Sequence, residues 1–233
     1  MAQPTMNPYN TFGTRLATGL DAVATAAPAT AEDIVGAVYA YIQPLYYSAS
    51  DTYLSEQLKS VLPFAINQYM NSQIGNPFGQ YNLQQQQIIF KLLETFKTVP
   101  IQSMIDFLLD IEDNIPKSGL SIQEQVPLFQ ATAVGKAGYS YWLGKAATPA
   151  GWTPYLDSNV NTNRTMVPEW TAACMEGVLL SAGLANTYGL VDPPRIIGID
   201  TISALTSAIG IAAWKVIFRN IPELHLASLG CSC

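Results

Sequence analysis

Three aspartates fall on one face of a predicted helix. Asp106, Asp110 and Asp113 follow one another at spacings of four and three residues, and Glu112 lies beside them. Carboxylates spaced in this way can converge on Mg²⁺ or Ca²⁺, which prefer oxygen ligands. An enzyme that used such a metal site to bind a diphosphate would also need a second acidic cluster and basic residues that hold the diphosphate. The chain offers neither. We therefore expect an ordinary solvated acidic face, and an enzyme or small-ligand carrier that uses this helix stays as an alternative.

Residues that could act as nucleophiles or zinc ligands are few and scattered. His225 is the only histidine, and no nucleophile motif surrounds it. Cys174 lies in an apolar helical pattern and is expected to be a small buried hydrophobe. Cys231 and Cys233 are expected in a plain solvated tail, with lipid attachment as the alternative. No glycine-rich phosphate-binding motif is present. The sequence therefore predicts no catalytic residue, no metal and no cofactor.

Composition excludes several classes of protein. Only 28 of the 233 residues are charged (11 Lys and Arg with 17 Asp and Glu), or 12%, against roughly 25% in typical soluble domains. The apolar set AVILMFWYC makes up 49%, which is too much for an intrinsically disordered chain. A net charge of −6 argues against nucleic-acid binding. The first residues carry no secretory signal pattern, so the cellular compartment stays unknown.

Apolar residues recur at spacings of three and four along almost the whole chain. This period predicts an all-α protein, folded as a single globular bundle of about seven or eight helices. Thr30 and Asn82 are expected helix N-caps. Ser121 and Glu124 form the strongest local signature, a capping box in which each side chain bonds the other's backbone N–H. Pro63 is expected to kink or break its helix.

Turn-forming residues divide the chain into segments of one domain. Gly144 is expected to end a long helix, Pro168 to lie in the first turn of the next, and the last helix to run from Asp200 to about Arg219. The stretch before Pro168 is longer than the roughly 12–15 residues of most loops. The predicted organisation is a flexible N-terminal arm at 1–11, a helical core at 12–144, a long irregular loop at 145–167, a C-terminal helical hairpin at 168–219 and a tail at 220–233.

Small residues recur every four positions in the last two predicted helices. The first row is Ala173, Gly177, Ser181 and Ala185, and the second row is Ala204, Ala208 and Ala212. Such rows let two helix backbones approach closely, in membranes and in water-soluble bundles alike. The uncharged stretches here are 15 residues (177–191) and 14 residues (201–214), whereas a spanning helix needs about 20. A close-packed buried hairpin is therefore predicted, and its insertion into a membrane stays as an alternative.

Aromatic residues are plentiful, with 12 Tyr, 8 Phe and 4 Trp. Several Tyr are near neighbours in sequence, so they cannot all face one core. Tyr and Trp are favoured at protein interfaces, where one end of the side chain is dry and the other is wet. We expect contacts with a partner from Trp152 and Tyr155 in the long loop and from Tyr46 and Tyr47. Packing of that loop onto its own domain is the alternative.

The scarcity of charge bears on function, because charge keeps a free monomer soluble and unassociated. The sequence predicts a non-enzymatic helical structural or interaction protein that self-associates or docks on a protein partner, without nucleic acid. A membrane-active protein that inserts its C-terminal hairpin is the first alternative. A ligand carrier or enzyme that uses the acidic helix is the second.

Overall fold

The computed structural model describes residues 7–46, 52–71, 77–187 and 193–218. This part of the chain holds eight α-helices of at least eight residues and no strand, which confirms the all-α prediction. The helices are α1 (Phe12–Ala26), α2 (Ala31–Tyr46), α3 (Thr52–Asn71), α4 (Leu83–Phe90), α6 (Met104–Asn114), α7 (Ile122–Ala147), α8 (Val160–Thr187) and α9 (Pro193–Ile217). Shorter pieces are a π-helical turn (Lys91–Thr95), α5 (Phe96–Thr98) and two 3₁₀ turns (Ile101–Ser103 and Ile115–Lys117).

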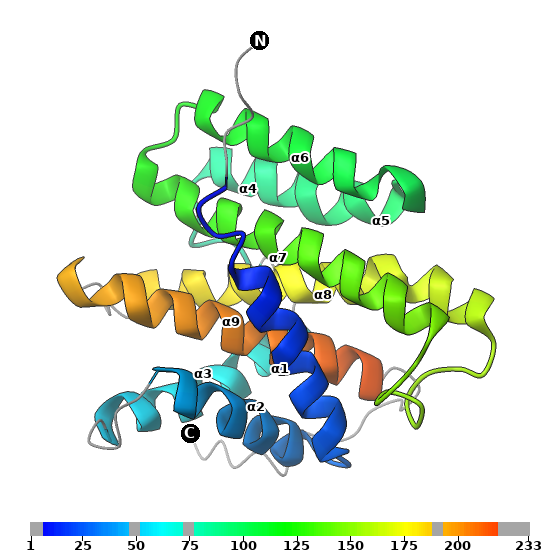
Figure 1. The fold of residues 1–233 in the computed structure, drawn as a ribbon. Coiled ribbons are helices and arrows are strands. Elements are labelled where there is room, and N and C mark those ends of the chain that lie inside the picture. Colours follow the sequence, from blue (N-terminus) through cyan, green and yellow to red (C-terminus); the bar gives the residue numbers. More distant parts are fainter. Residues whose placement is uncertain (1–6, 47–51, 72–76, 188–192, 219–233) are drawn as a thin grey trace.

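The helices stack in layers across the view of Figure 1. Helices α4, α5 and α6 form the upper layer, and α7 and α8 lie beneath them. Next comes α9, with α1 crossing in front of it, and α2 and α3 close the lower side. Helices α8 and α9 run antiparallel and pack against each other as the predicted hairpin. Because α8 also contacts α7 and α9 also contacts α2 and α3, the hairpin joins the upper layers to the lower one.

Side chains cap three helix starts where the sequence predicted caps. Asn82 accepts a hydrogen bond from the backbone N–H of Gln85 (2.9 Å), and Gln85 accepts one from the N–H of Asn82 (3.0 Å). Ser121 and Glu124 form the same reciprocal pair at the start of α7. The Thr30 hydroxyl accepts a backbone N–H at the start of α2 (3.1 Å). These bonds satisfy donors that a helix start otherwise leaves unpaired, and so they fix where the helices begin.

The middle of helix α9 is buried on every side. All residues from Ile202 to Ala213 are buried, whereas an ordinary surface helix would turn a polar face to solvent in each turn. Helices α1, α2, α3 and α8 all pack against it. Because α9 has no face suited to water along this stretch, its four neighbours are needed together to form the core.

The rows of small residues bring α8 and α9 into close contact at Gly177. A Cβ atom at this position would lie 2.5 Å from the backbone oxygen of Ser207 and 2.7 Å from the Cα of Ala208. The side chain of Ala185 lies outside the described residues. The other members of both rows are buried: Ala173, Ser181, Ala204, Ala208 and Ala212. Only glycine permits this approach, so the close-packed hairpin depends on position 177.

The long loop is shorter than predicted. Helix α7 continues past Gly144 to Ala147 and α8 begins at Val160, so the connection spans 148–159 rather than 145–167. Asn163, in the first turn of α8, accepts the backbone N–H of Asp157 (2.9 Å) and donates to its carbonyl (2.8 Å). Asn159, directly in front of the helix, accepts the backbone N–H of Asn161 (2.9 Å). Together these bonds stabilise a helix start well before Pro168.

Prolines interrupt the helices less than predicted. Pro63 lies inside α3 without ending it, and Pro168 lies inside α8 rather than in its first turn. Val167 and Trp170, on either side of Pro168, are completely buried. Burial of large apolar side chains offsets the roughly 3 kcal/mol that an interior proline costs a helix. Helix α9 also begins earlier than predicted, at Pro193.

The substitution Gly177→Ala should destabilise the protein, because the added methyl group meets the backbone of α9 and not a side chain that can turn away. We expect a loss of about 1–3 kcal/mol in the free energy of unfolding, measured by urea denaturation. Gly144→Ala is the matched control, because Gly144 is also inside a helix and nothing lies within 4 Å of its added Cβ. This control should gain about 0.5–1 kcal/mol. Equal effects at both positions would contradict the close contact.

Candidate functional site

The three aspartates of α6 form a solvated face and do not converge on one point. Asp106, Asp110 and Asp113 are all exposed, and the carboxylate of Asp110 lies 3.7 Å from the ammonium of Lys91. Over the described ranges, no three His, Cys, Asp or Glu side chains gather closely enough to hold a metal ion. Their neighbour Glu112 points the other way and is only 3% exposed.

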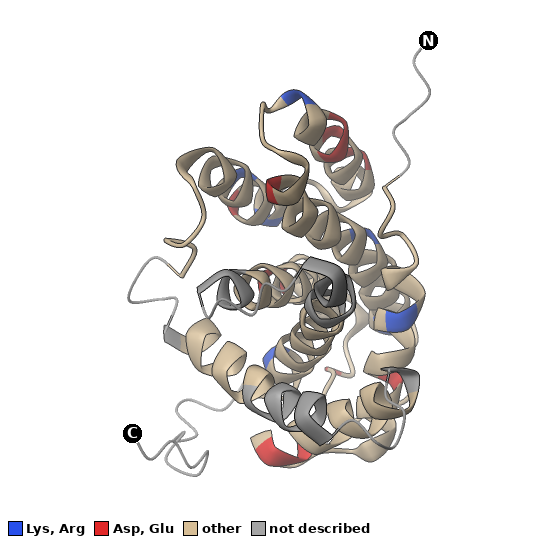
Figure 2. Cartoon of the chain, turned by 90° about the vertical axis from the view of Figure 1, so that its left-hand side faces the viewer, with Lys and Arg blue, Asp and Glu red and all other residues tan. Residues whose placement is uncertain are grey.

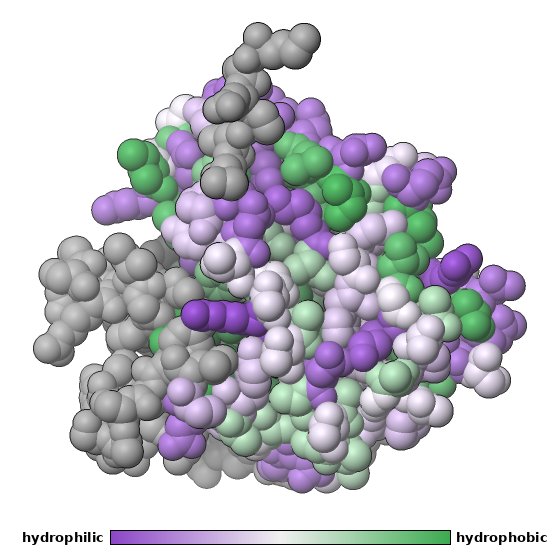
Figure 3. All heavy atoms as spheres, in the orientation of Figure 1, coloured by the Kyte–Doolittle hydropathy of each residue, from purple (hydrophilic) through white to green (hydrophobic). Residues whose placement is uncertain are grey.

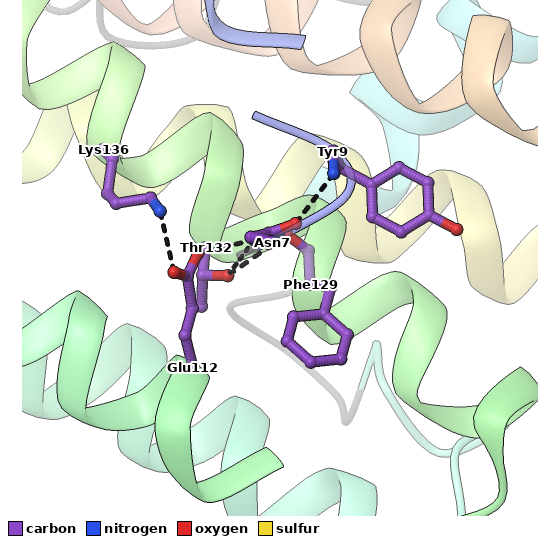
Figure 4. A network of polar contacts seen from close by, with 6 residues as sticks. All are labelled: Asn7, Tyr9, Glu112, Phe129, Thr132 and Lys136. Atoms are coloured by element: carbon purple, nitrogen blue, oxygen red, sulfur yellow. Dashed lines mark hydrogen bonds and ion pairs between the residues drawn. The ribbon is translucent and has the colours of Figure 1, made fainter. Parts of the chain in front are cut away.

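Glu112 lies in a buried polar network between α6 and α7 (Figure 4). The Lys136 ammonium lies 2.7 Å from one carboxylate oxygen of Glu112. The other oxygen accepts a hydrogen bond from Asn7 Nδ2 at 2.5 Å. The same Nδ2 donates to the Phe129 carbonyl (2.8 Å) and to the Thr132 hydroxyl oxygen (3.2 Å). The network therefore compensates a buried carboxylate with a cation and an amide donor, and it joins the start of the chain to two helices.

The N-terminal arm is docked from Asn7 onward, which corrects the prediction that it is flexible through residue 11. Asn7 is buried, and its side-chain oxygen accepts the backbone N–H of Tyr9 (2.9 Å). The Tyr9 ring then packs against Phe12 at the start of α1, with 5.9 Å between ring centroids. The partners of Asn7 lie more than a hundred residues further along the chain, so no local pattern could have indicated them.

Glu176, on α8, is a second carboxyl held largely away from solvent. Its side chain is 16% exposed, and the Lys97 ammonium lies 3.7 Å away. Burial raises the pKa of Glu176 to about 7, against the lowering influence of Lys97 and Lys215. Glu169 and Glu94 raise this pKa further through charge repulsion. The carboxyl therefore titrates near neutral pH, a property that the sequence pattern did not indicate.

Trp152 belongs to the core, so the predicted contact with a partner is corrected in favour of packing onto its own domain. The ring is completely buried, 5.1 Å from Trp142 between centroids, and Trp142 lies 5.3 Å from Trp170. The indole N–H of Trp152 donates to the Tyr141 hydroxyl oxygen at 2.6 Å. This cluster of aromatic rings attaches the 148–159 connection to α7 and α8.

The remaining predicted partner residues divide into two groups. Tyr155 is partly exposed, and its hydroxyl donates to the carbonyl of Pro28 (2.9 Å), which ties the connection to the start of α2. The side chain of Tyr46 and the whole of Tyr47 lie outside the described residues. So do His225, Cys231 and Cys233.

Cys174 is completely buried, as predicted. Burial raises the pKa of its thiol to about 12. A thiol with such a pKa stays protonated at neutral pH, whereas the reactive form of cysteine is the thiolate. Cys174 therefore acts as a small apolar side chain within α8.

Large apolar side chains are exposed on α4 and at the adjoining start of α7. The exposed fraction is 79% for Leu83, 71% for Phe90 and 84% for Ile122. Leu83 and Phe90 are seven residues apart, which is two helical turns, so they share the outward side of α4 with the exposed Gln87 between them. We call Leu83, Gln87, Phe90 and Ile122 the α4 surface.

Hydrogen bonds hold the starts of α4 and α7 together. Asn82 Nδ2 donates to Glu124 Oε1 (2.8 Å), and the buried side chain of Gln85 donates to the Glu124 carbonyl (2.9 Å). Leu83 and Ile122 are the first residues of these two helices, so both lie at the end of the bundle where α4 and α7 begin. Because Gln85 faces inward, the opposite side of α4 with Leu83 must face outward.

Sequence patterns did not lead to the α4 surface, because the helical period was used only to find the residues of α4 that face inward. The signal that could have found it is the spacing of Leu83 and Phe90 by seven residues, on the side opposite Ile89 and Leu92. Both of these inward residues are buried.

No family model, curated protein or solved structure matches this chain. Among the helices as far as they are described, none is both long and apolar enough to cross a membrane. Functional inference therefore rests on the residues of the chain itself.

Replacing Asn7 by alanine removes the only amide donor to the buried Glu112 carboxylate in this network. We expect a loss of about 1.5–3 kcal/mol in the free energy of unfolding, the usual range for a hydrogen bond to a charged group. Urea denaturation measures this loss, and Asn10→Ala is the control because Asn10 is exposed. A loss no larger than that of the control would show that the network does not hold the arm.

The raised pKa of Glu176 makes stability depend on pH. The folded state binds this proton up to about pH 7, whereas the unfolded carboxyl releases it near the ordinary glutamate pKa of 4.5. The stabilisation is therefore complete below the unfolded pKa and is lost as the pH rises toward 7, at up to about 1.4 kcal/mol per pH unit.

Glu176→Gln should abolish this loss, because glutamine keeps the shape of the side chain without a charge. The variant should be more stable than the parent at pH 8 by about 1–3 kcal/mol, and the advantage should shrink toward pH 5. Thermal unfolding at several pH values measures it, with Glu32→Gln as the control, because Glu32 is an exposed glutamate on α2. A difference from the parent that does not change with pH would contradict the assignment.

Proposed function

We propose that this chain is a non-enzymatic helical protein that self-associates, and that the α4 surface is where the copies meet. The observation that carries the proposal is the exposure of Leu83 and Phe90 along one side of α4 and of Ile122 at the adjoining start of α7. Burying a side chain of this size is worth about 1.5–3 kcal/mol relative to leaving it in water. Covering these three side chains with a partner would therefore favour association.

The low charge of the chain supports the same proposal. Figure 2 shows how few positions along the helices carry a charge, in keeping with 12% charged residues overall. On the face seen in Figure 3, weakly polar residues (white and pale) cover much of the lower half, and strongly hydrophobic ones lie in separate groups above. A surface with little charge does not keep copies apart by repulsion.

Light scattering after size exclusion tests this proposal on the full chain. The parent should have a mass above the 25.2 kDa of one chain at micromolar concentration. The triple variant Leu83→Gln, Phe90→Gln and Ile122→Gln should elute at the mass of one chain and keep its circular dichroism spectrum.

Val160→Gln is the control for this experiment. Val160 is also exposed, but by only 40%, and it starts α8, away from α4. Its substitution should leave the mass unchanged. A parent chain that stays a monomer at every concentration tested would reject the proposed self-association.

A further inference from the structure

We infer that the α4 surface is covered by α4 of a second copy, with the two helices antiparallel about a two-fold axis close to Gln87. This inference rests on the self-association proposed above and specifies the partner and its orientation. It concerns one occupant only, an identical chain, and it follows from the charge and the spacing of the residues on α4.

The first argument is the absence of charge. Helix α4 has the sequence LQQQQIIF, so none of its residues is charged. In a two-fold interface a surface meets itself, and a charge near the axis would meet its own copy. Gln87 suits this position because a glutamine amide both donates and accepts hydrogen bonds, so two copies can pair. A partner of opposite charge would find nothing on α4 to attract it.

Two ion pairs lie just beyond the end of α4. The Lys91 ammonium lies 3.7 Å from the Asp110 carboxylate, and the Lys97 ammonium lies 3.6 Å from the Glu94 carboxylate. These four residues together add no net charge at this end of the surface. The other two exposed aspartates of α6 add negative charge to the upper layer, so the uncharged contact is confined to α4 itself.

The second argument is register. Leu83 and Phe90 lie about 10 Å apart along the helix axis, and Gln87 lies close to the midpoint between them. An antiparallel pairing centred there places Leu83 of each copy opposite Phe90 of the other. Each copy then covers both exposed apolar side chains on α4 of the other copy. Ile122 is exposed at the start of α7, which hydrogen bonds join to the start of α4, so it lies at the same end of the bundle as Leu83.

The third argument is the direction of the helix dipoles. The N-termini of α4 and α7 lie side by side, and each carries a partial positive charge. A parallel pairing would bring four such ends together. In the antiparallel pairing, the helix N-termini of one copy lie about one length of α4 away from those of the other copy. Electrostatics therefore favours this orientation.

Substitution of Gln87 by charged residues tests the two-fold axis. Gln87→Glu alone should weaken self-association at least about tenfold, because two carboxylates meet near the axis, and Gln87→Lys alone should do the same. An equimolar mixture of the two variants should associate at least as tightly as the parent, because unlike charges then meet. Sedimentation velocity over a range of concentrations measures the dissociation constants.

The matched controls are Gln43→Glu and Gln43→Lys. Gln43 is an exposed glutamine on α2, in the layer farthest from α4, so these variants should associate like the parent. All variants are first compared by circular dichroism to confirm the helical fold.

The outcomes separate this inference from the proposed function. Weakening by each variant alone and recovery in the mixture would support the two-fold pairing of α4. A parent that associates while both Gln87 variants associate equally well would overturn the pairing and leave self-association in place. A monomeric parent would overturn both.

Discussion

The fold depends on the burial of α9 on all sides. A helix whose residues from Ile202 to Ala213 are all buried is stable in water only if other helices surround it. Helices α1, α2, α3 and α8 provide that surrounding, and α8 approaches closest because Gly177 has no side chain. This burial costs free energy, because it leaves polar groups unpaired in the same core. The hydroxyls of Ser181, Thr206 and Ser207 have no hydrogen-bond partner among the described residues. Dense apolar packing around them outweighs this cost.

The few buried charges join layers of the bundle. Glu112 and Lys136 connect α6 to α7, and Glu176 and Lys97 connect α8 to α5. Removing Lys136 would leave the buried Glu112 carboxylate without its cation, so this pair holds α6 on α7. The Glu176 pair differs, because burial raises the pKa of that carboxyl to about 7 and its charge is costly above this pH.

Sequence reasoning succeeded where the determining contacts are local or periodic. The capping boxes at Asn82 and Ser121 span four residues, and the small-residue rows repeat every four. It failed where the contacts are distant in sequence. Asn7 meets Glu112 only because α1 and α6 both pack against α7, and Trp152 is buried against Trp142 of α7. Pro168 shows a third limit, since a local preference to begin a helix was overridden by burial of its neighbours.

The residues of the α4 surface are those that the fold itself leaves unexplained. The capping box of α4 uses Asn82 and Gln85, so the helix start places no demand on Leu83. The α7 start likewise uses the residues on either side of Ile122. Polar side chains at these positions would form the same helices at no cost in packing, because both side chains are mostly in water. An apolar residue that the folded monomer does not need is best accounted for by an environment outside the monomer, and the nearest chemically matched environment is the same uncharged helix on another copy.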